Sequence, residues 1–358
     1  MPGLFPIGDA VVLFLNNYRS TGIGDFGGSL FERWTGLGYS VSIEETNPSG
    51  KGFHQQVRRI ARTEEALVTN VGLTGWGQSG FRNFIGFRAI SSHCRAGRTT
   101  VSILHHSIES FALEDTGYNP SSITRWGAHL ALRHLKNCRL IVFSPRLGAV
   151  LEDEYQMKPD WITPLPCNAC SEPAKWSNEQ AVIATVGYWA PYKGIDFFLD
   201  AAQALGHSYR WILAGKPHRV LSEDSAFRTR VAGWEGRARQ LGVSTPGYLS
   251  PSDLSRELDG RAIGVLPYSS ASGASAAFTL FAERGIPVVA SDLPEFRYLK
   301  ELGAGITLID PRGGELSRTL EYITSSSSAW SEMSRMQKDF SERYSWEKFV
   351  ERLAPMVG

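Results

Sequence analysis

The sequence has few cysteines and no long apolar run. Only 4 cysteines occur among 358 residues, so the chain lacks the disulfide framework of a small secreted protein. The longest strongly apolar run, residues 10–15, is strand-sized, whereas a membrane-spanning helix needs roughly 18 to 20 apolar residues. No Lys or Arg precedes Arg19, unlike the positive start of a secretory signal. We therefore expect a cytoplasmic protein without a transmembrane helix.

An excess of charge of either sign is also absent. Lys and Arg total 37 against 36 Asp and Glu, a formal net charge of +1, so we expect no nucleic-acid partner. Cys167 and Cys170 have C-x-x-C spacing, but Cys94 and Cys138 lie far from them in sequence, and a structural zinc site needs four ligands. We expect two free thiols near a domain boundary and no metal site; metal or redox chemistry is the less favoured alternative.

The composition is that of a globular protein of about two domains. Hydrophobic residues make up 42% and charged residues 20% of the chain, which excludes disorder as its main state. Short β-branched and aromatic segments alternate with helix-length segments, as in parallel α/β folds. The predicted strands are residues 10–15, 40–45, 66–71, 100–105, 139–144, 161–166, 181–187, 210–215, 243–249, 262–267, 287–291 and 305–309. Residues 168–180 have no apolar periodicity and are expected to link two Rossmann-like sheets.

A glycine-rich segment follows the first predicted strand. Gly22, Gly24 and Gly27 satisfy G-x-G-x-x-G, the fingerprint of dinucleotide binding, but the fingerprint belongs in the tight turn directly after the strand and six residues intervene here. Glycines let backbone N–H groups approach a phosphate or sugar, and we expect a helix to begin near Gly28 with its positive end toward that site. A loop that only turns the chain is the alternative.

The second half contains several segments in a characteristic order. TVGYWAPYKGIDFFLDAAQAL (185–205) precedes RWILAGKP (210–217) and GVLPYSSASGASAAFTLFAERGIPVVASDLPEF (264–296). This order resembles the donor domain of GT-B nucleotide-sugar glycosyltransferases, especially retaining family 4. Weaker similarities are the glycine-rich segment, a strand ending in His at 101–105, RLIVFS (139–144) and YSWEKF (344–349).

The resemblance implies a fold, a domain division and an activity. The fold is α/β GT-B, with two Rossmann-like domains whose parallel sheets face an interdomain cleft. Residues 1–168 would form the acceptor-side domain, 169–345 the donor-binding domain, and 346–358 a helix returning to the first domain. The activity would be a metal-independent hexosyltransferase without a cofactor. It would move a sugar from a nucleotide diphosphate donor to a hydroxyl of a glycan or lipid-linked glycan, in surface polysaccharide biosynthesis.

The resemblance also implies which residues meet the donor. Lys193 lies at a loop-to-helix junction after a predicted strand, where its ammonium would neutralise the departing diphosphate; a solvated lysine is the alternative. Small residues open a helix expected over 276–284, and their amides and hydroxyls would hold sugar and phosphates. The expected donor-binding residues are Gly27, Gly28, Gly187, Tyr188, Lys193, Lys216, Ser272, Gly273, Ala274, Ser275 and Thr279.

The chain departs from the family pattern at three of its positions. The two family Glu residues, separated by seven others, fall on Ser272 and Leu280, and the Arg that partners the lysine falls on Tyr188. Lys216 is the candidate substitute for that Arg. These departures leave the donor and the stereochemistry open. Two alternative functions also stay open. One is a nucleotide-sugar-binding protein without catalysis, and the other is an NAD(P)-dependent oxidoreductase that would use the glycine-rich segment.

Two residues of the first half complete the predicted catalytic set with Lys193. His105 ends a predicted strand where the family often has a His beside the donor sugar; a structural histidine is the alternative. Asp25 would accept the proton of an acceptor hydroxyl if the enzyme inverts; a turn residue is the alternative. Residues 66–108 contain no Asp or Glu, while arginines and aromatics recur there. Such a stretch can lie on anionic lipid, which would make the protein peripheral on the membrane, or its aromatics can belong to the core.

Overall fold

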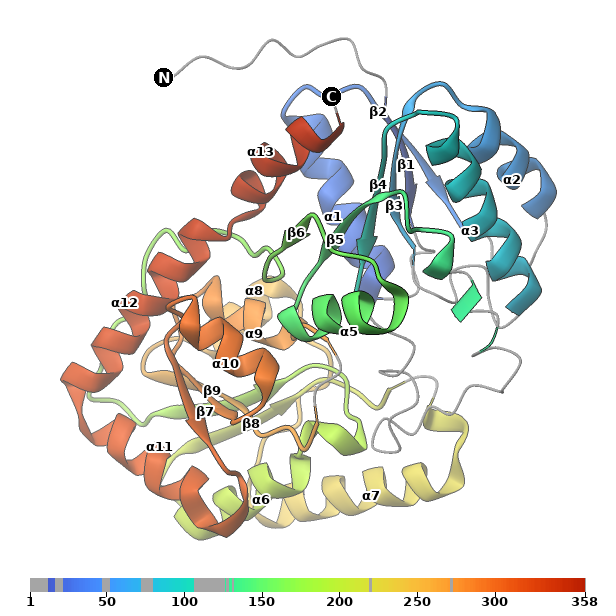
Figure 1. The fold of residues 1–358 in the computed structure, drawn as a ribbon. Helices are drawn as coiled ribbons and strands as arrows, with labels where there is room; N and C mark the ends of the chain where they lie inside the picture. Colours follow the sequence, from blue (N-terminus) through green and yellow to red (C-terminus); the bar gives the residue numbers. More distant parts are fainter. Residues whose placement is uncertain are drawn as a thin grey trace. The chain divides into compact units, whose positions relative to one another are not determined.

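The chain divides into two compact units, each built on one parallel sheet (Figure 1). The computed structural model describes residues 12–16, 22–46, 52–71, 80–105, 126, 129–130, 132–218, 221–270 and 273–357. The described residues up to Pro164, together with the C-terminal helix from Trp346, form unit 1, and Leu165–Ser345 form unit 2. The predicted α/β class with two parallel sheets is confirmed.

Unit 1 has a six-stranded sheet in the order β2-β1-β3-β4-β5-β6. Its strands are β1 (Val12–Asn16), β2 (Val41–Glu45), β3 (Ala66–Asn70), β4 (Thr100–Leu104), β5 (Arg139–Val142) and β6 (Trp161–Ile162). Its main helices are α1 (Gly22–Gly36), α2 (Phe53–Arg62), α3 (Gly80–Arg95), α5 (Pro145–Tyr155) and α13 (Trp346–Val357). The glycine-rich segment therefore lies inside α1, and the helix starts at Gly22 rather than near Gly28.

Helices pack on both faces of the unit 1 sheet, and the inner strands β1, β3 and β4 are buried along nearly their whole length. Leu13 and Leu15 pack into the core that contains side chains of α2 and α3, two helices that lie side by side (Figure 1). Phe14 points to the opposite face, where its ring meets Trp34 of α1 edge to face at 6.4 Å. Helix α13 packs against α1 and against β3 and β4. Residues adjacent along a strand thus serve two separate apolar layers.

Unit 2 has a five-stranded sheet in the order β11-β10-β9-β7-β8. Its strands are β7 (Val182–Val186), β8 (Arg210–Ala214), β9 (Ala262–Leu266), β10 (Val288–Ser291) and β11 (Ile306–Ile309). Its α-helices are α6 (Ile195–Leu205), α7 (Ser225–Gln240), α8 (Pro251–Glu257), α9 (Ala276–Ala282), α10 (Pro294–Glu301), α11 (Glu315–Ser325) and α12 (Ser327–Arg343). Short 3-10 turns are η3 (Pro191–Lys193), η4 (Gly206–Ser208), η5 (Leu221–Glu223) and η6 (Arg312–Gly314).

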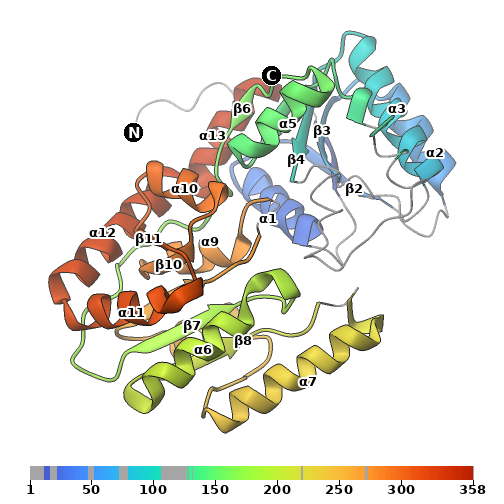
Figure 2. The same ribbon diagram turned by 60° about the horizontal axis from the view of Figure 1, so that its bottom comes forward.

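The unit 2 sheet also lies between two helical layers. Ile183 and Leu213 face the core shared with α6, α7 and α11, and α6 and α7 run side by side in both views (Figure 2). Val182 and Ile212 face the other core, which contains side chains of α8, α9, α10 and α12. All five strands pair in parallel, so their carboxyl ends lie at one edge of the sheet.

One predicted strand is wrong and another is shortened. Residues 243–249 form no strand, and only Ser244 makes a bridge, with Ile212 of β8. Pro246 lacks an N–H group and Gly247 has a φ of +77°, so the segment cannot extend the ladder beyond Ser244. The predicted strand 161–166 is reduced to Trp161–Ile162.

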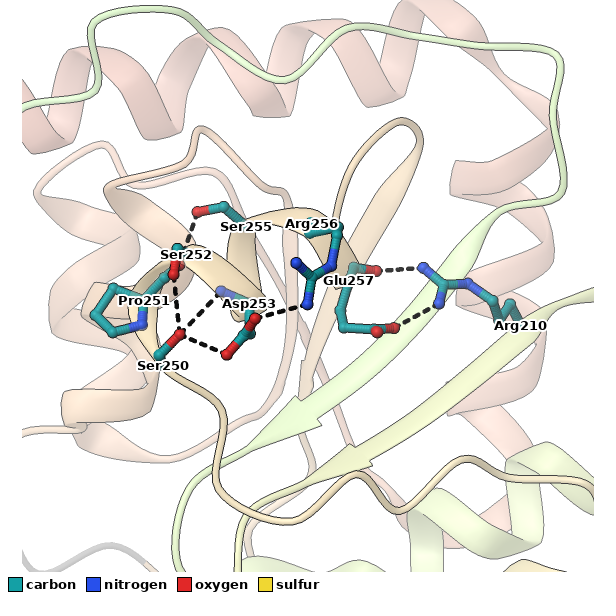
Figure 3. A network of polar contacts seen from close by, with 8 residues as sticks. All are labelled: Arg210, Ser250, Pro251, Ser252, Asp253, Ser255, Arg256 and Glu257. Carbon is teal, nitrogen blue, oxygen red and sulfur yellow. Dashed lines mark hydrogen bonds and ion pairs between the residues drawn. The ribbon is translucent and has the colours of Figure 1, made fainter.

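A network of polar contacts fastens α8 to the edge strand of unit 2 (Figure 3). The Ser250 hydroxyl caps α8 by accepting from the Asp253 N–H at 3.1 Å, and Arg256 donates to the Asp253 carboxylate at 2.6 Å. Arg210, the first residue of β8, donates to the Glu257 carboxylate at 2.7 Å. The Ser250 hydrogen bond, followed by that of Arg256, lowers the pKa of Asp253.

The arginine-rich and aromatic stretch of unit 1 is divided between core and surface. Phe87 of α3 is buried, whereas Phe81 is 69% exposed, and Trp76 lies outside the described residues. Among the helices that the structure describes, none is both long and apolar enough to cross a bilayer.

Candidate functional site

The topology of unit 2 marks one point on its sheet edge. After β7 the chain moves outward to β8, and the later strands β9, β10 and β11 follow on the other side of β7. Open α/β sheets bind ligands outside the carboxyl ends of their strands at such a switch point. Lys193 follows β7 and Tyr268 follows β9, so these two residues come from the strands that flank the switch point.

Glycine brings the loops after β7 and β9 into direct contact. Gly194 has a φ of +66°, and a Cβ atom there would lie 1.8 Å from the carbonyl oxygen of Pro267. The Ser269 N–H donates to the Tyr192 carbonyl at 2.9 Å. The glycine of the K-G pair is therefore required both for its left-handed backbone and for this close approach. Because the two loops touch, Lys193 lies beside the loop that carries Tyr268.

Lys193 is held by aromatic groups. Its Nζ donates to the Tyr268 hydroxyl at 2.8 Å and lies 4.0 Å from the centroid of the Tyr268 ring and 4.9 Å from that of Tyr192. Burial lowers the pKa of Lys193, but the phenol oxygens of Tyr192 and Tyr268 raise it, with a net shift above the ordinary value. The group is therefore charged at neutral pH.

The charge of Lys193 has no carboxylate partner within the described part of the chain. A half-buried cation whose charge no carboxylate neutralises favours an anionic ligand, because the ligand supplies the missing counter-charge. Without a ligand, the aromatic rings stabilise the cation. This arrangement suits a phosphate group.

A second lysine lies at the end of the neighbouring strand. A Cβ atom on Gly215 would lie 1.8 Å from the Gly187 carbonyl oxygen, and the Trp189 N–H donates to the Lys216 carbonyl at 2.8 Å. The ends of β7 and β8 are thus joined, which puts the Lys216 ammonium 5.9 Å from the Tyr188 ring centroid. Lys216 is exposed and also lies 5.6 Å from the ring of Tyr248.

The small-residue loop after β9 is partly described. Ser275 caps α9 by accepting from the Phe278 N–H at 3.3 Å, and its Oγ lies 3.2 Å from the Tyr268 hydroxyl. Thr279 donates its hydroxyl to the Ala276 carbonyl at 2.8 Å. Gly273 and Ala274 are half-buried, and Ser272 lies outside the described residues. Helix α9 ends at Ala282, two residues before the predicted end.

Unit 1 has its own switch point, between β1 and β3. Asn16 and Asn70 end these strands, and both are fully buried. Asn70 Nδ2 donates to Asn16 Oδ1 at 2.7 Å and to the Ile23 carbonyl at 2.7 Å. His105 Nε2 lies 2.7 Å from Asn70 Oδ1; an amide oxygen only accepts, so Nε2 carries the proton. Sequence reasoning missed this asparagine pair, although a polar residue at the end of an apolar strand is a usable signal.

The glycine-rich segment packs onto this pair. A Cβ atom on Gly27 would lie 1.8 Å from Asn16 Oδ1, whereas Gly28 has open space around its Cα. Gly27 therefore allows α1 to approach the sheet closely. Asp25 lies in the first turn of α1 rather than in a loop; its side chain is exposed, and partial burial raises its pKa. The ring of Phe26 meets that of His105 at 4.8 Å.

All four cysteines are free thiols. Cys167 and Cys170 are buried in unit 2, where Cys170 Sγ donates to the Glu172 carbonyl at 2.9 Å. In the described ranges no group of three or more His, Cys, Asp or Glu residues is arranged to hold a metal ion.

Known proteins share the fold of this chain but little of its sequence. No family model matches the chain, and no curated protein matches it. HepE of Anabaena, solved with UDP-glucose, has a TM-score of 0.69 at 14% identity and covers 97% of this chain and 99% of its own. Sucrose-phosphate synthase of Thermosynechococcus elongatus has a TM-score of 0.69 at 14% identity, with 97% and 98% covered. WaaB, a lipopolysaccharide outer core galactosyltransferase, has a TM-score of 0.61 at 11% identity, with 97% and 98% covered.

The likeness extends over nearly the whole chain and includes both sheets. At identities of 11 to 14% the likeness concerns the architecture alone, because one fold hosts many functions. The predicted GT-B architecture is confirmed: the chain has the fold of the GT-B glycosyltransferases.

Proposed function

We propose that this protein is a glycosyltransferase that moves a sugar from a nucleotide diphosphate donor to a hydroxyl of a glycan or lipid-linked glycan. The observation that carries the proposal is the Lys193 ammonium at the switch point of unit 2, held by Tyr192 and Tyr268 without a carboxylate partner in the described chain. HepE, which shares the fold, has been solved with UDP, and a nucleoside diphosphate is the anion that we propose for this site.

The reaction breaks the bond between the anomeric carbon and the diphosphate oxygen and forms a bond to the acceptor oxygen. Negative charge develops on the departing diphosphate, and Lys193 would stabilise it. Lys216, exposed at the end of the neighbouring strand with its ammonium 5.9 Å from the Tyr188 ring centroid, would add a second positive charge in place of the family's arginine, whose position is Tyr188 here. Since two lysines can supply this charge, we propose that transfer is independent of metal and uses no cofactor.

The acceptor proton distinguishes two mechanisms. In an inverting enzyme a base removes the proton on the face opposite the leaving group, and Asp25 is the proposed base. In a retaining enzyme the departing phosphate takes the proton on the same face, and His105 would then contact the sugar. The partly buried hydrogen bond from His105 to Asn70 fixes the orientation of the imidazole ring, as a contact with the sugar would require.

The acceptor class rests on the proteins that share the fold. WaaB acts on the outer core of lipopolysaccharide, and HepE has been solved with UDP and glucose. We therefore propose a sugar hydroxyl as the acceptor and a hexose as the transferred group. A cytoplasmic location with peripheral membrane contact stays a prediction.

A thermal-shift panel tests the proposal. The purified protein is heated with UDP-, GDP-, ADP- and TDP-sugars and, separately, with NADH and NADPH. A ligand present at about 100 times its dissociation constant adds roughly 2.7 kcal/mol to the free energy of unfolding. We expect one nucleotide sugar to raise the melting temperature and the nicotinamides to have no effect. Stabilisation by a nicotinamide that Gly24→Val abolishes would establish the oxidoreductase instead. Stabilisation by a sugar nucleotide without transfer to any glycan would establish the binding protein.

A further inference from the structure

We propose that Tyr268 is a positioning residue that aligns Lys193 and the Ser275 hydroxyl as paired donors to the anionic oxygens of the donor diphosphate. The inference rests on the proposed function and deepens it. The resemblance to family 4 implies no role for Tyr268. It places Ser275 only among the small residues of the donor-binding loop.

The direction of the hydrogen bonds follows from the chemistry of the three groups. An ammonium only donates, so Tyr268 Oη accepts the 2.8 Å hydrogen bond from Lys193 Nζ. Tyr268 is only 4% exposed, and a buried phenol O–H normally finds an acceptor. Ser275 Oγ, 3.2 Å away, is the other polar contact of Tyr268 Oη in the described structure. The phenol proton therefore points to Ser275.

Ser275 then has one donor left to offer. Its Oγ accepts from Tyr268 and also from the Phe278 N–H at 3.3 Å. A hydroxyl has two acceptor lone pairs and one proton, so both acceptor positions are filled and the proton remains. Ser275 is half-buried, which leaves its hydroxyl within reach of a ligand.

The chain of hydrogen bonds thus presents donors at both ends. Lys193 has three N–H groups, of which Tyr268 takes one, and Ser275 has its O–H. Hydrogen bonds in such a chain polarise one another, so the charge of Lys193 strengthens the donor character of the Ser275 hydroxyl through Tyr268. An anionic phosphate oxygen accepts from both ends, whereas a cation or a bare N–H donor would be repelled.

Packing keeps the phenol in place. The Tyr268 ring meets Phe296 edge to face at 5.4 Å and Tyr192 at 5.9 Å. A ring fixed on two sides loses little conformational entropy when a ligand arrives, which is the condition for a preorganised site. Tyr268→Phe therefore removes the hydroxyl while these ring contacts remain.

Titration calorimetry with UDP, GDP, ADP and TDP tests the proposal. We expect Lys193→Met to weaken binding of the preferred nucleotide by about tenfold or more, and Tyr268→Phe and Ser275→Ala each by about fivefold. The Tyr268→Phe, Ser275→Ala double variant should be weakened by far less than the product of the two, because both remove the same hydrogen bond. Tyr209→Phe, which loses a 3.0 Å hydrogen bond to Thr324, is the matched control and should bind normally.

The ammonium signal of Lys193 supplies a readout that a purely structural role would not move. In ¹H–¹⁵N spectra of lysine side chains, the signal lost in Lys193→Met should show slow proton exchange in the wild type. Its exchange should accelerate at least severalfold in Tyr268→Phe and stay unchanged in Tyr209→Phe.

The outcomes separate the two claims. Weaker binding in Lys193→Met with unchanged binding in both Tyr268→Phe and Ser275→Ala would overturn the positioning role and leave the proposed function standing. Unchanged binding in Lys193→Met, or no binding of any of the four nucleotides to the wild type, would overturn the proposed function and this inference together. Multiplicative effects in the double variant would show that Tyr268 does not act through Ser275.

Discussion

The Cα of Gly194 lies against the carbonyl oxygen of Pro267 so closely that a methyl group on Gly194 would be 1.8 Å from that oxygen. This single approach joins the loops after β7 and β9, the two strands that flank the switch point of unit 2. The positions of Lys193 and Tyr268 both depend on it.

Gly194→Ala should therefore separate the two loops. The added Cβ must displace the Pro267 backbone, and a φ of +66° is unfavourable for alanine. We expect a lower melting temperature and, in the protein that remains folded, nucleotide affinity reduced by about tenfold. Calorimetry at a temperature well below the transition measures the second effect.

Gly314→Ala is the matched control. Gly314 also precedes a helix in the left-handed conformation, with a φ of +77°, but no atom lies within 4 Å of its Cβ position. It should show only the cost of the left-handed backbone for alanine, about 1 to 2 kcal/mol, with normal nucleotide affinity. Equal loss of affinity in both variants would show that the Pro267 contact does not shape the site.

The sequence could predict the fold because its signals are local and repeated. Apolar segments of strand length alternate with helical segments, and most of them became strands of two parallel sheets. The prediction of a strand over 243–249 was wrong because it followed the apolar residues Val243 and Leu249, although Pro246 and Gly247 between them are sequence signals against pairing. The sequence also suggested a helix start near Gly28, because glycines such as Gly22 and Gly24 are typical of loops. The close packing of α1 on Asn16 at Gly27 becomes visible only in the structure.

Lys216→Ala should weaken donor binding by a smaller factor than loss of Lys193. Lys216 is exposed, so its contribution is screened by salt, whereas that of a half-buried group is screened much less. We expect about threefold weaker nucleotide binding at low ionic strength and a difference that nearly vanishes in about 0.5 M salt. Lys175→Ala, at a lysine 84% exposed on the side chain, is the control. A loss of nucleotide affinity that does not depend on salt, or unchanged affinity at low ionic strength, would contradict this role for Lys216.

Asp25 and His105 have opposite expected effects in the two mechanisms. If the product linkage is inverted, Asp25→Asn should lower turnover by about a hundredfold or more with donor binding nearly intact. If configuration is retained, that change should be mild and His105→Ala more harmful. The coupling constant at the new anomeric centre decides between the two stereochemistries. Inversion by a fully active Asp25→Asn enzyme would exclude Asp25 as the base.

The pH dependence of an inverting enzyme would report Asp25 directly. Burial raises the pKa of this carboxyl, and a base must be deprotonated to act. Turnover should therefore fall with decreasing pH along a limb that lies above the ordinary Asp value of 3.8 and that Asp25→Asn removes.

His93 should make the fold less stable in mild acid. It is fully buried between the Thr100 hydroxyl at 2.8 Å and the Glu65 carbonyl at 3.0 Å. Burial lowers its pKa despite the raising effect of that carbonyl. The unfolded histidine titrates near 6.5, so below this pH the unfolded state binds more protons and the free energy of unfolding falls until the folded-state pKa is reached.

His93→Gln retains an N–H donor for the Glu65 carbonyl and cannot titrate. Urea unfolding at intervals between pH 7.5 and 5 should show a shallower loss of stability in this variant, by up to about 1.4 kcal/mol per pH unit for one proton. Parallel curves for the two proteins would show that His93 does not contribute to the pH dependence.

The site was only partly accessible to sequence reasoning. Lys193 and Ser275 were identified from motif positions, and their chemistry depends mainly on their own side chains. Tyr268 was missed because its importance comes from a contact with Lys193, 75 residues away in sequence. Asn16 and Asn70, 54 residues apart, were missed for the same reason. Pairings of this kind depend on strand order, which the sequence pattern left open.

Binding of a nucleoside diphosphate to the wild type and to Lys193→Met tests the central claim most directly. Calorimetric titrations with UDP, GDP, ADP and TDP should find one nucleotide that binds the wild type and Lys175→Met equally. The same nucleotide should bind Lys193→Met at least tenfold more weakly, since a charge-assisted hydrogen bond contributes about 1.5 to 3 kcal/mol. Equal affinity for wild type and Lys193→Met, with both proteins folded, would contradict the proposed role of Lys193 and with it the proposed function.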